Sequence, residues 1–129
     1  MKGVILISGN GSNLQSIIDQ AVSIDLQISA VISNEKNAYG LERAKAAGIK
    51  TYFVYPKLFT ERVDFDQELV KIIDSLNVEL IVLAGFMRIL STLFINHFSG
   101  KVLNIHPSLL PKYQGLDTQI GRASCRERV

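Results

Sequence analysis

The sequence is poor in features that mark secreted, membrane or metal-binding proteins. Its single cysteine, Cys125, cannot form a disulfide within the chain and offers no cysteine cluster for a metal, so no metal site is predicted. No apolar run reaches the roughly 18 residues that a membrane-spanning helix needs. Residues 1–8 (MKGVILIS) lack the pattern of a secretory signal and instead resemble a buried strand. We therefore expect a cytoplasmic protein with no membrane partner.

A basic excess is also missing from most of the chain. Of 14 Lys and Arg and 12 Asp and Glu, three arginines and one glutamate lie in residues 119–129, which leaves 11 of each sign in residues 1–118. Nucleic-acid-binding surfaces are usually basic, so this balance argues against a nucleic-acid partner. Small molecules are the expected partners, and the oligomeric state is left open.

Apolar runs alternate with segments of helical periodicity. Strands are predicted at residues 3–8, 26–33, 51–55, 80–84 and 101–105, and helices at about 12–22, 39–47, 61–76 and 91–98. Continuous apolar runs are typical of parallel strands that are covered on both faces. The alternation predicts an α/β fold with a doubly wound, mostly parallel, Rossmann-like sheet and right-handed crossovers.

A glycine-rich turn, residues 9–13 (GNGSN), joins the first predicted strand to the first predicted helix. Ser12 and Gln15 match a capping box, and the amides at such a helix start can bind an anion. Leu14 replaces the third glycine of a dinucleotide fingerprint, and the ending of a Walker loop is absent. A single phosphate is therefore the expected ligand, with a ligand-free tight turn as the alternative.

Asn104 and His106 lie two residues apart at the end of the last predicted strand. Side chains with this spacing share one face of a strand, and the carboxyl ends of parallel strands are where α/β proteins bind ligands. His106 can act as a general acid or base near neutral pH. The alternative is a capped strand end, in which His106 bonds a neighbouring carbonyl group.

Three motifs together resemble the folate-dependent formyltransferases. They are residues 104–113 (NIHPSLLPKY), 7–15 (ISGNGSNLQ) and 83–90 (LAGFMRIL). The last two sharpen the resemblance to the branch that acts on glycinamide ribonucleotide, and the likeness runs over about residues 2–118. It implies transfer of a formyl group from the co-substrate 10-formyltetrahydrofolate to the amine of 5-phosphoribosylglycinamide, a step of de novo purine biosynthesis.

The resemblance also implies roles for single residues. His106 and Asn104 would be catalytic, and the ribonucleotide phosphate would bind to Gly11, Ser12 and Asn13. The folate would contact Arg62, Met87, Arg88, Ile89, Leu90 and Asn104. Acyl transfer passes through an oxyanion, to which the Asn104 amide can donate while His106 donates or shuttles protons. From sequence alone Arg62 and Arg88 also fit exposed surface positions.

Two other functions stay open. The first is a related formyltetrahydrofolate-handling enzyme, such as a formyltetrahydrofolate hydrolase or a methionyl-tRNA formyltransferase, although the neutral charge of residues 1–118 argues against tRNA. The second is a non-catalytic Rossmann module that binds a nucleotide or phosphate. Binding of NAD without binding of glycinamide ribonucleotide would favour this function.

Residues 119–129 (QIGRASCRERV) lack apolar periodicity and depart from the family pattern. A DNA string that resembles a sequencing-library adapter encodes them when it is read in frame. We therefore expect residues 1–118 to be an incomplete formyltransferase N-terminal α/β domain and residues 119–129 to be a non-native tail; a genuine divergent end is the alternative. Family members continue beyond this point with an aspartate partner for the histidine, so we expect little activity from this chain alone.

Overall fold

The computed structural model describes residues 1–105 of the chain. Its strands are β1 (Lys2–Ile7), β2 (Gln27–Ser33), β3 (Thr51–Phe53), β4 (Leu80–Ala84) and β5 (Val102–Ile105). They form one sheet in the order β3-β2-β1-β4-β5, in which every neighbouring pair is parallel. The predicted doubly wound, parallel sheet is confirmed.

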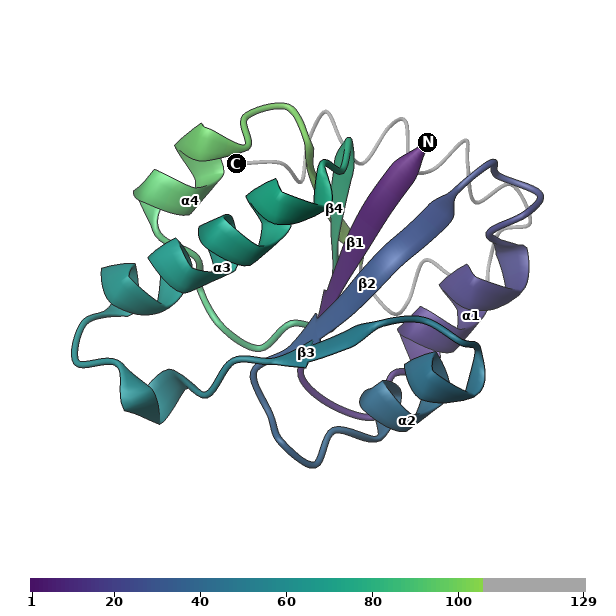
Figure 1. Cartoon of the computed structure of the whole chain (residues 1–129), viewed down its shortest axis with the longest axis horizontal. Helices are drawn as coiled ribbons and strands as arrows, with labels where there is room; N and C mark the ends of the chain where they lie inside the picture. Colours follow the sequence, from purple (N-terminus) through teal and green to yellow (C-terminus); the bar gives the residue numbers. More distant parts are fainter. Residues whose placement is uncertain (106–129) are drawn as a thin grey trace.

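Helices cover both faces of this sheet (Figure 1). They are α1 (Ser12–Gln20), α2 (Tyr39–Ala46), α3 (Arg62–Leu76) and α4 (Thr92–His97), with a short 3-10 helix, η1 (Pro56–Leu58), before α3. Helices α1 and α2 lie on one face, and α3 and α4 on the other. Each face carries its own apolar cluster, so the sheet is the middle of three layers.

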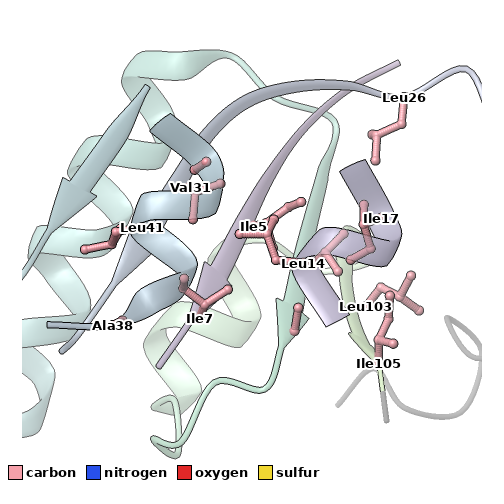
Figure 2. Packing of buried hydrophobic residues seen from close by; sticks show 13 residues of the cluster. Ile5, Ile7, Leu14, Ile17, Leu26, Val31, Ala38, Leu41, Leu103 and Ile105 are labelled. Atoms are coloured by element: carbon pink, nitrogen blue, oxygen red, sulfur yellow. The ribbon is translucent and has the colours of Figure 1, made fainter. Parts of the chain in front are cut away.

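The alternation of side chains along β1 explains why its apolar run is continuous. Ile5 and Ile7 join the cluster under α1 and α2, as Figure 2 shows, whereas Val4 and Leu6 join the cluster under α3 and α4. All four side chains are fully buried. A strand that is covered on both faces buries the side chains that point either way, which favours a continuous apolar run.

The start and the end of α1 differ from prediction. Gly11, not Ser12, is the N-cap residue, and no side chain caps the helix, so the predicted capping box is wrong. Gly11 has a φ of 84°, which turns the chain toward α2 before the helix begins. The helix ends at Gln20, two residues before the predicted end, and Val22 is 95% exposed. A tertiary contact at Gly11 thus overrides the local capping pattern.

Other element ends follow the sequence more closely. Ser91 caps α4, because its Oγ accepts a hydrogen bond from the amide of Phe94. Gly48 follows the C-cap of α2 with a φ of 75°, a conformation typical of a C′ glycine. Strand β3 stops at Phe53, two residues earlier than predicted, and the sequence analysis missed η1, which Pro56 begins.

Candidate functional site

The strand order locates a switch point between β1 and β4. From β1 the chain moves outward through β2 to β3, and it then returns to β4 on the other side of β1. In open α/β sheets ligands bind at the carboxyl ends of the strands that flank such a point. Two segments leave the sheet there. Residues 9–13 follow β1 and include the first two residues of α1, and residues 85–91 follow β4.

The first loop lines a cleft of about 710 Å³. The predicted phosphate residues Gly11, Ser12 and Asn13 all line it, together with Gly85 and Met87 from the loop after β4. The first turn of α1 contains no acidic residue, although Glu35, from the loop after β2, also lines this cleft. The amides at a helix start lack partners within the helix and carry a partial positive charge.

A close approach between two glycines shapes the first loop. A Cβ atom at Gly11 would lie 2.5 Å from the Cα of Gly40 in α2, and one at Gly40 would lie 2.4 Å from Cδ1 of Ile7. The amide of Gly40 also donates a hydrogen bond to the carbonyl oxygen of Gly9 at 3.1 Å. The loop therefore rests directly on the backbone of α2.

Arg43 of α2 also holds this loop, and the sequence analysis did not single it out. Its Nε donates to the carbonyl oxygen of Asn10 at 2.9 Å, and its Nη2 donates to Oδ1 of the same residue at 2.8 Å. The guanidinium lies 5.0 Å from the ring centre of Tyr39. The one signal in the sequence was Gly40 inside a helical pattern, since such a glycine often marks a close packing contact.

The second cleft, of about 950 Å³, lies beside the loops that follow β2 and β3. Its charged lining residues are Lys36, Lys57, Arg62, Arg88, Glu35 and Glu61. Arg62, the first residue of α3, is exposed, and Met87 lines this cleft as well as the first. Four cations against two carboxylates leave an excess of positive charge, which suits an anionic ligand group.

The third cleft, of about 420 Å³, is mainly apolar. Its lining residues are Leu83, Phe86, Met87, Arg88, Ile89, Leu90, Ile95 and Asn104. Met87 is 81% exposed and Ile89 is 74% exposed, although both are large apolar side chains. Exposed apolar side chains beside an amide group suit a flat ligand with polar edges.

Most of the predicted site residues come together around Met87, which lines all three clefts. The structure does not bring Arg62 and Asn104 to one cleft, because Arg62 lines the second and Asn104 lines the third. Asn104 pairs with Leu83 in the sheet, which places it next to β4. His106 lies outside the described residues.

Buried side chains hold the loop after β4. The Ser8 hydroxyl donates to Oδ1 of Asn34 at 2.6 Å and accepts from the amide of Met87 at 2.7 Å. Oδ2 of Asp66, a fully buried residue of α3, accepts from the amide of Ser91. Between these points the Arg88 guanidinium lies 4.3 Å from the ring centre of Phe65.

Two possible features are absent from this part of the chain. In residues 1–105, no group of three or more His, Cys, Asp or Glu side chains could hold a metal ion. None of the helices described is long and apolar enough to cross a membrane.

The fold and its clefts define a doubly wound α/β protein whose cavities open at the carboxyl ends of its strands. The profile of the formyl transferase family matches residues 1–125, and the chain belongs to that family. The Escherichia coli (strain K12) phosphoribosylglycinamide formyltransferase is 52% identical over 120 residues, which cover 92% of this chain and 57% of that protein.

Solved structures and larger relatives agree with this assignment. The phosphoribosylglycinamide formyltransferase of Coxiella burnetii, solved in complex with CHES, has a TM-score of 0.80 and 52% identity, covering 92% of this chain and 56% of that one. The human trifunctional purine biosynthetic protein adenosine-3 is 46% identical over 113 residues, which are 86% of this chain and 11% of that protein. The chain thus spans just over half the length of the Escherichia coli and Coxiella burnetii relatives.

Proposed function

We propose that this chain forms the N-terminal part of an enzyme that transfers a formyl group from 10-formyltetrahydrofolate to the amine of 5-phosphoribosylglycinamide, in de novo purine biosynthesis. One observation carries the proposal: a cleft lined by a phosphate-type loop and an apolar cleft beside Asn104 meet at a single residue, Met87. Two ligands held in these clefts would come together at that residue. The names of the relatives support the same reaction.

The phosphate of the ribonucleotide would bind to Gly11, Ser12 and Asn13. The loop suits a phosphate because glycine lets the backbone approach the ligand and because the start of α1 has no competing carboxylate or side-chain cap. The loop also holds its conformation through Gly40 and Arg43, so its amides need little reordering when the ligand arrives.

The folate would lie along the loop after β4. Its pterin ring would pack on the apolar side chains and hydrogen-bond to backbone groups of Met87, Arg88, Ile89 and Leu90, whose segment lines the third cleft. The anionic end of the folate would reach the second cleft, where Arg62 lies among several cations. Met87 and Arg88 line both clefts, so one extended ligand could occupy them together.

The chemistry would fall to Asn104 and His106. Attack of the amine on the formyl carbon forms a tetrahedral oxyanion, and the side-chain amide of Asn104 can donate a hydrogen bond to that oxygen. His106 would donate to the same oxygen or move a proton from the attacking amine to the leaving nitrogen. Neither step needs a metal ion or a covalent enzyme intermediate. We also propose that the enzyme is cytoplasmic.

A hybrid protein tests the activity directly. Residues 1–118 of this chain would be joined to the remaining C-terminal part of the Escherichia coli relative, which is 52% identical to this chain where the two align. We expect the hybrid to consume both substrates and form the formylated ribonucleotide, and we expect Asn104→Ala to abolish most of the rate. Because residues 119–129 are proposed to be a non-native tail, the hybrid omits them.

The outcomes separate the competing functions. Release of formate without transfer to the ribonucleotide would indicate a hydrolase and contradict the proposal. Binding of NAD to the 129-residue chain, without binding of glycinamide ribonucleotide, would instead favour a nucleotide-binding module. A hybrid that folds, binds neither substrate and catalyses nothing would reject formyl transfer for these residues.

A further inference from the structure

Side chains from other elements accept hydrogen bonds from two backbone amides of the loop after β4. Residues 85–91 belong to neither a helix nor a strand, so their amides cannot be satisfied by a regular ladder. Backbone amides withdrawn from water nevertheless need acceptors. In this loop two such amides, those of Met87 and Ser91, use oxygens of side chains from other elements.

The first of these oxygens belongs to Ser8, the residue that follows β1. Ser8 is only 6% exposed. Its hydroxyl connects three segments, since it donates a hydrogen bond to Asn34 after β2 and accepts one from Met87 after β4. A hydroxyl has one hydrogen to donate and lone pairs to accept, so both contacts are made by a single group. Alanine at this position would leave the Met87 amide and the side-chain Oδ1 of Asn34 without these partners.

The second oxygen belongs to Asp66, in the second turn of α3. This side chain is fully buried, and its Oδ2 accepts from the amide of Ser91, the N-cap residue of α4. Its Oδ1 has no hydrogen-bond partner among residues 1–105. A buried carboxylate is costly to keep, so its presence at this point favours a positioning role over simple packing.

We propose that Ser8 and Asp66 are positioning residues that fix the two ends of residues 87–91 and so set the shape of the folate-binding wall. The proposal rests on the function proposed above. Ser8 reaches the loop from the sheet and Asp66 reaches it from α3, so the loop is held from two directions. Between the two anchored amides lie Arg88, Ile89 and Leu90, which line the third cleft.

The anchors differ in what they affect. Met87 lines all three clefts, so loosening its amide changes the junction between both proposed ligands, and Ser8 itself lines the cleft of the phosphate loop. Asp66 holds the far end of the wall, and neither Asp66 nor Ser91 lines the cleft of the phosphate loop. Loss of the Ser8 hydroxyl should therefore weaken the binding of both substrates, whereas loss of the Asp66 contact should weaken mainly the binding of the folate.

Amide hydrogen exchange of the 129-residue chain tests the anchoring without any substrate. Ser8→Ala should raise the exchange rate of the Met87 amide about tenfold relative to the amides of β4, because one buried hydrogen bond is lost. Ser8→Thr, which keeps the hydroxyl, should restore protection. Asp66→Ala should do the same to the Ser91 amide, and Asp66→Asn, which keeps an acceptor oxygen, should largely restore it.

Ser33→Ala provides a matched control. Ser33 is fully buried and its hydroxyl also makes two hydrogen bonds, but both go to the backbone of Glu35 in its own loop. Its loss should lower stability without raising exchange at Met87 or Ser91 selectively. Unchanged protection of Met87 in Ser8→Ala, or equal exposure in Ser33→Ala, would overturn the anchoring.

Kinetics of the hybrid then test the consequence for ligands. We expect Asp66→Asn to retain KM values close to the unsubstituted hybrid, and Asp66→Ala to raise KM for 10-formyltetrahydrofolate about tenfold with a smaller change for the ribonucleotide. Equal changes in both KM values would contradict the assignment of Asp66 to the folate wall. If the hybrid lacks formyl transfer activity, the proposed function is rejected. The exchange measurement still decides whether the two side chains anchor the loop.

Discussion

The two loops at the switch point are held in different ways, although a side chain, Arg43, also contacts the first. The loop of residues 9–13 rests on the backbone of α2 through Gly11 and Gly40, with room for no side chain between them. The loop of residues 85–91 contacts its surroundings through buried side chains, Ser8 and Asp66, while Met87 and Ile89 remain exposed.

This difference follows from what each loop presents. An anion is bound by backbone amides, so the first loop needs a fixed backbone and little side-chain volume. A flat apolar ligand is bound by side chains, so the second loop needs large exposed residues on a backbone that is held from behind. Substitutions should therefore change stability in the first loop and ligand affinity in the second.

The largest effect is expected for Gly11→Ala. The new Cβ would lie 2.5 Å from a backbone atom of Gly40, and the φ of 84° is unfavourable for alanine. We expect the free energy of unfolding to fall by about 3 kcal/mol, from strain and overpacking together. Urea unfolding would measure it, with Gly48→Ala as control: its φ is 75°, but nothing lies within 4 Å of the new Cβ. Equal losses of stability in both variants would show that the close approach between Gly11 and Gly40 does not contribute to the effect.

Met87→Ser should separate affinity from stability. The Met87 side chain is 81% exposed, so its replacement should change the free energy of unfolding by less than about 0.5 kcal/mol. Affinity of the hybrid for the folate should fall about tenfold, because a ligand would bury this side chain. Val22→Ser, at a 95% exposed position away from the clefts, should change neither quantity. A stability loss in Met87→Ser comparable to that of Gly11→Ala would break the comparison.

Arg43→Lys should have an intermediate effect on the first loop. Lysine keeps the charge but cannot donate to the carbonyl and the side chain of Asn10 in the same fork geometry. We expect a loss of about 1 kcal/mol in the free energy of unfolding, together with weaker binding of the ribonucleotide. Thermal unfolding and a ribonucleotide titration would measure the two. Unchanged phosphate affinity would show that Arg43 acts on the fold alone.

Lys45→Ala, two residues away on the same helix, should have the smallest effect. Lys45 pairs with Glu42 at 3.6 Å, and both side chains are largely exposed. Exposed ion pairs contribute between about 0 and 1 kcal/mol, so we expect less than about 0.5 kcal/mol by urea unfolding. A larger loss than that of Arg43→Lys would mean that the charge of α2, and not the contact with Asn10, supports the loop.

Much of the fold was predictable because local signals agreed with the tertiary structure. The continuous apolar run of β1 implied a strand covered on both faces, and Ile5 and Leu6 indeed face opposite layers. The predicted phosphate residues line the first cleft, although their role stays a prediction. The prediction of Ser12 as a cap was wrong because the capping pattern is local. Gly11 instead packs against Gly40, which lies 29 residues further along the chain.

The sequence by itself determined the class of fold, the family and the two loops that carry the candidate site. Periodicity and turn residues act over a few positions, so a single chain displays them directly. Only the tertiary structure decided that Arg43 supports the first loop and that Ser8 and Asp66 support the second. These contacts join segments 25 to 79 residues apart, and their partners are determined by how the layers pack.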